Sequence, residues 1–551
     1  MVTDRLAALV GAALEKVAAE GGLGTADLPQ PSFERPRNRE HGDWATNIAL
    51  VASKGGGKPR DIAQAIVAAL EPSDLVERVE VAGPGFLNFR LSRTWLHDVV
   101  RRAASGSRFG RSDEGSGSAV NVEYVSANPT GPINVVSGRH AAVGDTISAL
   151  LEATGHRVTR EYYFNDAGRQ MLLFGASVAA RYLQHFGLDA AVPEDGYKGE
   201  DVTRVAEAIA TEIGDELVAA DPEERDQRML ELAWPRVLAR AKASLERFGS
   251  RFDVWFQEST LHEKGEVGAA IDRVREKGLI EERDGALWFL STRFGDDKDR
   301  VVIRSNGEPT YFAADLGYLV DKFGRGFDRL IYLWGADHHG TVPRLMAAVD
   351  ALGFDRSSVE IPLMQIVTLT REGEAVKASK RQGVYVALDE LVDEVGVDAA
   401  RYTFLTRSID APLEFNIDLV KEQAPENPVY YVQYAHARIS SILRRAEEEG
   451  YELSFDDGPL GRLMHPSEDE LMRKLASYEE VVPEAARLRA PQRITRYVEE
   501  LASTFSSFYR DCKVITEDRE LTAGRLALAL ATRAVVADGL GLLGVSAPER
   551  M

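Results

Sequence analysis

The chain of 551 residues has almost no cysteine and no long apolar run, and each shortage excludes a class of protein. Its one cysteine, Cys512, excludes an internal disulfide and any metal site built from several cysteines. No stretch of about eighteen apolar residues occurs, and Met1-Val-Thr-Asp-Arg5 begins an amphipathic helix rather than a signal peptide. We therefore expect a soluble cytoplasmic protein that makes no contact with a membrane.

An excess of basic residues is also lacking. The 66 lysines and arginines are outnumbered by 87 aspartates and glutamates, so the formal net charge is −21. A generic nucleic-acid coat protein needs a basic surface and is excluded. An RNA enzyme that has local basic patches remains compatible with this charge. The length predicts two to four domains.

One stretch predicts a nucleotide pocket. Residues 120–125 form a short apolar run typical of a buried strand, and the following Ser126-Ala-Asn-Pro-Thr-Gly-Pro132 is a loop because of its prolines and glycine. Residues 138–153 have helical periodicity, and residues 156–163 look like a second strand. This order predicts a right-handed βαβ unit whose loop meets a helix N-terminus, a favourable place for a phosphate.

The rest of the chain predicts distinct regions around this unit. Residues 1–112 look like a separate α/β module that contains a hairpin over 79–91, and about 165–260 looks like a helical insertion. The α/β pattern returns over 285–420, with strands expected at 286–290, 301–304 and 329–334. After Asn427-Pro428 the pattern is helical and predicts an all-α bundle.

Two further loops carry chemical groups. Gly335-Ala-Asp-His-His-Gly340 follows the last of these strands; adjacent histidines point apart, which disfavours a metal site and favours hydrogen bonding to a nucleotide or amino acid. Lys377-Ala-Ser-Lys380 is read either as a solvated basic turn or as a mobile loop that brings two ammonium groups to a triphosphate.

Together these motifs resemble a known family. The loop 126–132 followed by Gly138-Arg139, and Lys377-Ala-Ser-Lys380 downstream, resemble the two signature motifs of class I aminoacyl-tRNA synthetases in their arginyl form. Segments near residues 41–43, 85–89, 427–438 and 539–545 extend the likeness to arginyl-tRNA synthetases along the chain. The first signature departs from the family, because Asn134-Val-Val-Ser137 stands where the family has His-x-Gly-His.

The resemblance implies an architecture. It consists of an α/β Rossmann-like class I catalytic domain with a parallel sheet over 113–425, an N-terminal α+β domain over 1–112 and a C-terminal all-α anticodon-binding bundle over 426–551. The N-terminal domain would contact the tRNA elbow. The tRNA-binding positions that follow from the likeness are Phe86, Asn88, Tyr434 and Arg438.

The resemblance also implies an activity, the ligation of L-arginine to tRNA(Arg) through arginyl-adenylate, with ATP and Mg²⁺, by a chain expected to be a monomer. Catalysis would fall to Asn134, Ser137, Lys377 and Lys380. The positions that match the arginine site are Glu123, Ser126, Asn128, Tyr311 and Asp315, with Asp315 or Glu123 paired to the guanidinium. The positions that match the ATP site are Pro129, Thr130, Gly131, Pro132, Asn134, Ser137, Gly138, Gly335, Asp337, His338, Lys377, Ser379 and Lys380.

The altered first signature leaves an alternative open. Asn134 and Ser137 can still donate hydrogen bonds to phosphates, whereas Val136 places a side chain where the family's glycine admits adenine. The alternative function is therefore a synthetase-like paralogue that binds tRNA or regulates without aminoacylation.

Overall fold

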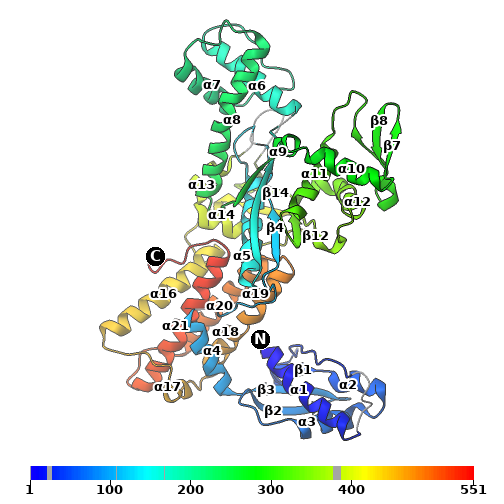
Figure 1. Cartoon of the computed structure of the whole chain (residues 1–551). Coiled ribbons are helices and arrows are strands. Elements are labelled where there is room, and N and C mark those ends of the chain that lie inside the picture. The colour runs from blue at the N-terminus through cyan, green and yellow to red at the C-terminus, as the bar shows by residue number, and fades with distance from the viewer. Residues whose placement is uncertain are drawn as a thin grey trace.

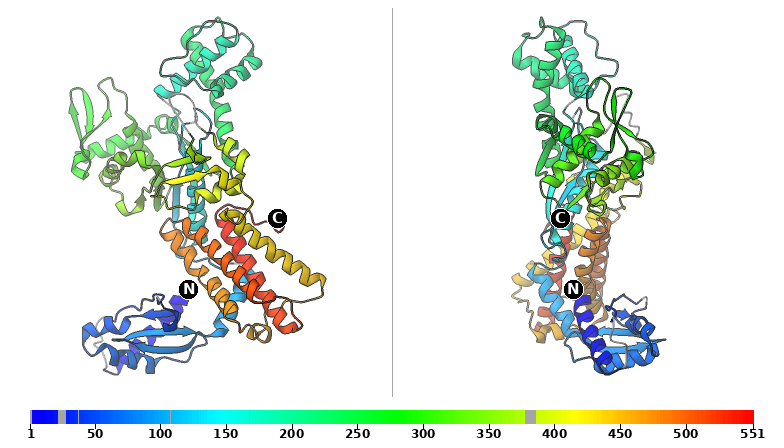
Figure 2. Two further views of the ribbon diagram at one scale, coloured as in Figure 1. Left: turned by 180° about the vertical axis from the view of Figure 1, so that it is seen from behind. Right: turned by 45° about the vertical axis from the view of Figure 1, so that its right-hand side comes forward.

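A parallel sheet lies at the middle of an elongated molecule (Figure 1). The computed structural model describes residues 2–21, 28–36, 38–106, 108–128, 130–166, 168–376 and 386–551. The N-terminal region and a helical bundle lie at one end of the molecule, and a helical insertion projects from the other, as both views of Figure 2 show. None of the helices in these ranges is long and apolar enough to cross a membrane.

The central sheet has the strand order β12-β10-β4-β5-β6, and every pair in it is parallel. The strands are β4 (Ala119–Glu123), β5 (Arg157–Phe164), β6 (Val254–Gln257), β10 (Arg329–Tyr332) and β12 (Val359–Glu360). Helix α5 (Val135–Ala153) connects β4 to β5, so the predicted βαβ unit is confirmed. The chain adds strands first on one side of β4 and then on the other, which creates a topological switch point between β4 and β10.

Close packing fixes α5 against the sheet. All of β4 is buried, and Tyr124, which follows it, is fully buried as well. A Cβ on Gly144 of α5 would come within 2.2 Å of the Tyr124 ring, so this contact requires glycine. The first turn of α5 is thereby held at the carboxyl end of β4.

The insertion consists of α6 (Arg169–His185), α7 (Glu200–Ile213) and α8 (Pro222–Arg247), which share a core of their own that includes Phe174, Tyr182 and Ile209. Strand β6 falls within the range expected for the insertion. The sequence analysis missed it because this strand has only four residues, which follow the insertion directly.

The strands expected at 286–290 and 301–304 exist, but they do not join the central parallel sheet. Strands β7 (Ile280–Arg283), β8 (Ala286–Phe289) and β9 (Arg300–Ile303) form a separate antiparallel sheet. Asp284 and Gly285, at φ +53° and +74°, make the tight turn between β7 and β8. Such a two-residue turn joins antiparallel strands only, because a parallel pair needs a crossover connection.

The N-terminal region contains α1 (Val2–Ala19), α2 (Ile48–Ala52) and α3 (Pro59–Ala69) beside a sheet of β1 (Trp44–Thr46), β3 (Phe86–Leu91) and β2 (Val76–Ala82). The predicted hairpin is confirmed by the antiparallel pairing of β2 and β3. Helix α4 (Arg93–Ser105) packs against the C-terminal bundle instead, where Arg101 pairs with Asp457 at 2.5 Å.

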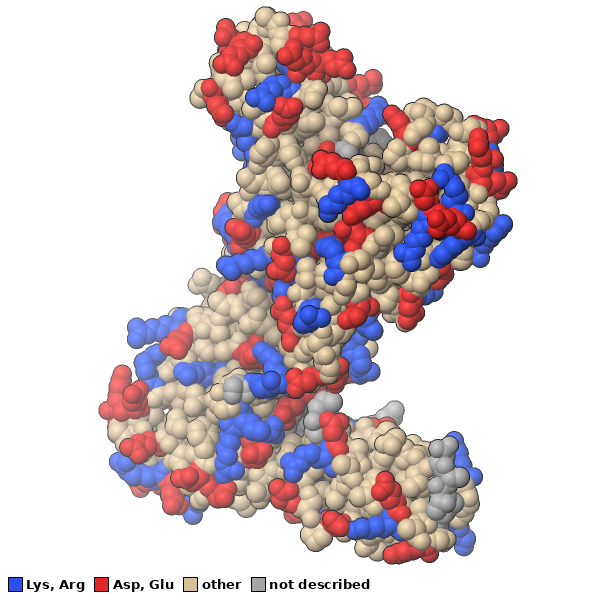
Figure 3. Space-filling model, in the orientation of Figure 1, with Lys and Arg blue, Asp and Glu red and all other residues tan. Residues whose placement is uncertain are grey.

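The C-terminal bundle is helical, as predicted. Its main helices are α16 (Pro428–Glu448), α18 (Pro466–Ala476), α19 (Tyr478–Arg487), α20 (Gln492–Asp511) and α21 (Arg519–Leu542). Helix α16 buries an apolar stripe that includes Val429, Val432, Ala435 and Ile439. Figure 3 shows basic side chains gathered over this bundle among acidic ones, although the chain as a whole is acidic.

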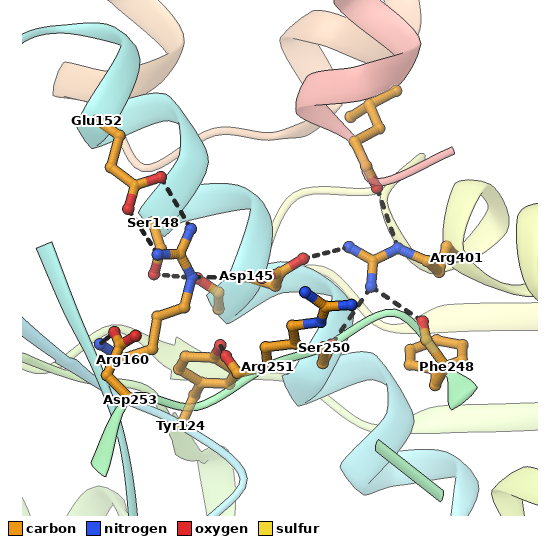
Figure 4. Close-up of polar contacts among 12 residues, drawn as sticks. Tyr124, Asp145, Ser148, Glu152, Arg160, Phe248, Ser250, Arg251, Asp253 and Arg401 are labelled. Carbon is orange, nitrogen blue, oxygen red and sulfur yellow. Dashed lines mark hydrogen bonds and ion pairs between the residues drawn. The ribbon is translucent and has the colours of Figure 1, made fainter. Parts of the chain in front are cut away.

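A buried arginine, Arg401, connects helix α5, the helical insertion and the C-terminal bundle (Figure 4). Arg401 of α14 (Val397–Phe404) is fully buried and pairs with Asp145 of α5 at 2.6 Å. Its guanidinium also donates to the carbonyls of Phe248 and Leu543, at the C-terminal ends of α8 and α21, at 3.1 and 3.2 Å. A cation between two helix C-termini is favoured by both helix dipoles, so Arg401 ties the insertion and the bundle to α5.

Candidate active site

A cavity of about 490 Å³ lies at the switch point of the parallel sheet. Its wall comes from the carboxyl ends of β4, β5 and β10, the first turn of α5, α11 (Tyr311–Gly324) and the start of α12 (Val342–Leu352). The cavity brings together a large part of the residues expected from the sequence, namely Glu123, Ser126, Asn134, Ser137, Tyr311, Asp315, Gly335, Asp337 and His338.

The Glu123 carboxylate is already matched by a cation. Its Oε2 lies 2.6 Å from Nζ of Lys322, whose side chain is completely buried, and its Oε1 accepts a hydrogen bond from Ser126 Oγ at 3.1 Å. The Lys322 ammonium lies over the rings of Tyr318 and Tyr332, at 4.4 and 4.0 Å from their centroids. Both oxygens of Glu123 are therefore occupied within the protein.

In contrast to Glu123, Asp315 is not paired with a cation among the described residues. It lies one turn after Tyr311 on α11, and its carboxylate forms no hydrogen bond or ion pair with any residue that the structure describes. Burial raises the pKa of Asp315 to about 7, against the lowering effect of the Arg344 charge; Glu258 and Glu123 raise it further. Asp315 is therefore an acidic group whose charge a cationic ligand would stabilise.

The first signature loop ends in a capped helix. The Asn134 side chain caps α5 by accepting a hydrogen bond from the Ser137 backbone N–H at 2.9 Å. This occupies Oδ1 and leaves the amide Nδ2 of Asn134 as a donor on the cavity wall. Val136, 46 % exposed, also lines the cavity from this first turn, so its side chain shapes the space that the family's glycine leaves open.

The chain that follows the second signature is hydrogen-bonded to the first. Asn134 and Ala387 form an antiparallel bridge, and the N–H of Leu388 donates to the carbonyl of Ile133 at 2.8 Å. On the other side of the loop, the N–H of Val376 donates to Leu369 at 2.9 Å. Lys377, Ser379 and Lys380, and also Pro129, lie outside the described residues.

Several expected residues do not line the cavity. The Asn128 side chain is engaged elsewhere, because its amide donates to Gln170 at 2.6 Å and its oxygen accepts from the Asn165 N–H at 3.1 Å. Gly138 packs against Leu388, whose methyl group would lie 2.6 Å from an added Cβ. Thr130, Gly131 and Pro132 are also absent from the described wall.

The sequence analysis missed several residues of the wall, including Tyr163, Tyr318, Tyr332, Trp334 and Arg344. A signal was present for part of this set. Tyr311, Asp315, Tyr318 and Lys322 are spaced by four, three and four residues, which places them on one face of a helix. The aromatic residues at the ends of β5 and β10 carry no such pattern, because they reach the cavity only through the sheet topology.

A larger hollow of about 710 Å³ lies near Asp398, Tyr430 and Met551, away from the carboxyl ends of the parallel strands. The Asp398 carboxylate accepts hydrogen bonds from Gln433, at 2.8 Å, and from the Ser546 hydroxyl. The smaller cavity has the uncommitted acid Asp315 and lies at the carboxyl ends of the parallel strands, so it is the better candidate for the reaction.

The residues expected to contact tRNA lie in different settings. Tyr434 of α16 is 41 % exposed, and the Arg438 guanidinium lies 4.7 Å over its ring. Tyr430 stacks on Tyr434 with centroids 6.2 Å apart, and Arg438 also lies over Tyr509. At the N-terminal site Phe86 is half-buried, whereas Asn88 is only 7 % exposed in the middle of its sheet.

Sequence models of three families match the chain in order. They are "Arginyl tRNA synthetase N terminal domain" over residues 4–91, "tRNA synthetases class I (R), catalytic domain" over 103–410 and "DALR anticodon binding domain" over 432–551. The parallel α/β domain between an α+β region and a helical bundle is thus the architecture that the sequence predicted.

Relatives match over nearly their whole length. The arginine–tRNA ligase of Moorella thermoacetica is 48 % identical over 99 % of this chain and 98 % of its own, and that of Desulforudis audaxviator is 48 % identical over 98 % and 97 %. An arginyl-tRNA synthetase structure from Campylobacter jejuni is 32 % identical with a TM-score of 0.76, and it covers 84 % of this chain and 100 % of that one. A Thermus thermophilus structure shares the fold, with a TM-score of 0.77 at 23 % identity over the full length of both chains.

These likenesses support a ligase and not the paralogue that only binds or regulates tRNA. The chain belongs to the arginyl-tRNA synthetases, the class I ligases that activate arginine with ATP and transfer it to tRNA(Arg).

Proposed function

We propose that the cavity at the switch point binds arginine and ATP next to one another, and that Asp315 pairs with the arginine guanidinium. The observation that supports this most directly is that Asp315 is an acid without a partner among the described residues, in the same wall as the capped N-terminus of α5. A guanidinium requires a carboxylate that can accept its paired N–H groups. Glu123, which is paired with Lys322, supports the wall of the arginine site. Tyr311 and Ser126 are the other residues of this site.

The reaction then depends on positioning. The arginine carboxylate attacks the α-phosphate of ATP, which gives arginyl-adenylate and pyrophosphate. A terminal ribose hydroxyl of tRNA then attacks the arginyl carbonyl, forms the ester and releases AMP. Backbone N–H groups at the start of α5, with Asn134 and Ser137, donate to the phosphates as charge develops. Lys377 and Lys380 stabilise the leaving pyrophosphate, and Gly335, Asp337 and His338 hold the nucleoside.

Mg²⁺ is proposed to accompany ATP. This ion prefers few protein ligands and is held largely by substrate phosphates. Asp337 fits such a site, because its carboxylate is 79 % exposed at the cavity wall. The ion would offset phosphate charge.

For tRNA we propose two contacts. Tyr430, Tyr434, Arg438 and Tyr509 form a surface of stacked rings and a cation that suits unstacked anticodon bases. Phe86 is the better placed of the two N-terminal candidates, because Asn88 is buried. We further propose domains over 1–112, 113–425 and 426–551, a monomeric chain, and the cytoplasm as its location.

The test is aminoacylation by the full chain with arginine, ATP and tRNA(Arg). Asp315→Asn is expected to raise the KM for arginine at least about tenfold, because a charge-assisted hydrogen bond contributes about 1.5–3 kcal/mol. Asp350→Asn is the matched control, since Asp350 pairs with Arg356 at 2.6 Å and does not line the cavity. An unchanged KM for arginine in Asp315→Asn would place the guanidinium site elsewhere.

A further inference from the structure

Some charged residues of the cavity wall form no ion pair with another described residue. Glu123 is matched by Lys322, and Asp315 has no ion pair among the residues that the structure describes. Within those same residues, Arg344 is the one lysine or arginine that lines the cavity. Apart from the exposed Asp337, whose neighbour is His338 at 3.8 Å, the cavity wall therefore holds one unmatched acid, Asp315, and one unmatched base, Arg344.

The position of Arg344 is unfavourable for an arginine that serves stability alone. It is the third residue of α12, whose N-terminal dipole opposes a cation. Its Nε is buried and has no hydrogen-bond partner in the described part of the chain, and its guanidinium lies 5.5 Å over the Phe312 ring. Arg344 therefore has no anionic partner among the described residues, and stability alone does not explain an arginine at this position. Its charge is available to act on other groups of the cavity.

Arg344 of α12 and Asp315 of α11 line the same cavity. The two side chains form no direct ion pair, yet the Arg344 charge is the main effect that opposes burial in setting the pKa of Asp315. The other titratable or charged groups that face Asp315 are Glu123 of β4, Tyr163 of β5, Glu258 of α9 (Glu258–Glu263), Tyr332 of β10 and Lys322 of α11. Lys322 is committed to Glu123, the two glutamates favour protonation of Asp315, and both tyrosines titrate well above neutral pH because burial raises their pKa.

We propose that Arg344 is a positioning residue for substrate arginine: its guanidinium favours the ionised form of the Asp315 carboxyl group, so that a larger fraction of the protein presents an anion to the substrate guanidinium. The inference rests on the proposed role of Asp315. Two guanidinium groups, one from the protein and one from the substrate, then flank a single carboxylate without competing for the same N–H···O contacts.

The consequence is a link between pH and arginine affinity. Removal of a nearby opposite charge raises a carboxyl pKa by about one unit or more. With a pKa of about 7 in the parent, half of Asp315 is ionised at pH 7. A rise of one unit leaves about a tenth ionised, so the KM for arginine would rise about fivefold at pH 7 and by less than about 1.5-fold at pH 8.5.

The experiment compares Arg344→Gln with Arg344→Lys in aminoacylation of tRNA(Arg) by the full chain, from pH 6 to 8.5 with saturating ATP and tRNA. We expect Arg344→Gln to raise the KM for arginine at pH 7, to approach the parent KM at pH 8.5 and to change kcat little. Arg344→Lys, which keeps the charge, should stay close to the parent profile. Arg356→Gln is the control for loss of a neighbouring arginine, because Arg356 pairs with Asp350 outside the cavity.

Other outcomes separate the two hypotheses. A KM raised by the same factor at every pH, or a fall in kcat with the KM for arginine unchanged, would overturn the positioning role; the second result would mean that Arg344 contacts the reacting carboxylate or phosphate. If Asp315→Asn leaves the parent KM for arginine unchanged, the proposed arginine site itself fails. Thermal unfolding of each variant shows whether it is folded.

Discussion

Glu123 on β4 and Lys322 on α11 form an ion pair of 2.6 Å across the floor of the cavity, with both side chains almost completely buried. The two residues are 199 positions apart in the chain. Because the pair holds the carboxyl end of β4 against α11, it positions the loop that follows β4, with Ser126, relative to Asp315 on α11. Glu123 therefore supports the cavity wall, whereas Asp315 has no ion pair among the described residues.

The first prediction concerns this pair. Lys322→Met leaves Glu123 buried without a counter-ion, which is expected to cost about 3–5 kcal/mol of stability. Calorimetry should show the unfolding transition of the catalytic domain at a lower temperature. The double variant Lys322→Met/Glu123→Gln removes both charges and should recover most of the loss. A single variant as stable as the parent would contradict the structural role.

The second prediction concerns protons released when arginine binds. Burial raises the pKa of Asp315 to about 7 in the empty cavity, so the carboxyl group is half protonated at pH 7. A bound guanidinium lowers this pKa, so binding should release about half a proton at pH 7 and less as the pH rises. The affinity for arginine accordingly increases as the pH rises through 7 and levels off above it.

Calorimetric titration in buffers of different ionisation enthalpy measures this release. Asp315→Asn is the control, since it has no proton to lose at that position and should abolish the dependence on the buffer. Release that persists in Asp315→Asn would assign the proton to another group.

The third prediction concerns the contact between α21 and Arg401. Gly544 has φ +67°, and a Cβ there would lie 2.3 Å from the Arg401 guanidinium. Gly544→Ala should therefore destabilise the protein by the left-handed conformation, about 1–2 kcal/mol, and by displacement of a buried cation in addition. Gly541→Ala is the control, because a Cβ there meets nothing within 4 Å and alanine favours the helix. Equal melting temperatures for the two variants would show that the contact is not required.

The sequence predicted those parts of the site whose signals are local. The loop 126–132 and the helix that follows it are consecutive residues, so their pattern predicted the βαβ unit and the helix N-terminus at the cavity. The acidic pocket was also predicted, but the choice between Glu123 and Asp315 was not. That choice depends on Lys322, which no local pattern connects to Glu123.

The antiparallel sheet of β7 to β9 was predicted from the sequence only in part. Strands β8 and β9 were predicted from composition, whereas β7 was not. Asp284-Gly285 was the available signal for the β7–β8 pair, because this dipeptide favours a hairpin. Arg344 had no signal of any kind, since a single arginine near a helix start is ordinary until the topology places it beside Asp315.

The fourth prediction concerns the surface of Tyr430, Tyr434, Arg438 and Tyr509, which we propose to bind an anticodon base. Tyr434 is exposed, Tyr430 stacks on it and Arg438 covers its ring, so the surface is preformed for a base. Tyr434→Ala should raise the KM for tRNA(Arg) by about five- to a hundredfold, because stacking of one base contributes about 1–3 kcal/mol. The KM values for ATP and arginine should stay close to those of the parent, since the cavity lies in another domain. Tyr451→Ala is a matched control, because Tyr451 is covered by Arg519 at 5.1 Å in a similar cation–aromatic pair near the other end of the same helix. If both variants weaken tRNA binding equally, the effect comes from the bundle as a whole and not from a base on Tyr434.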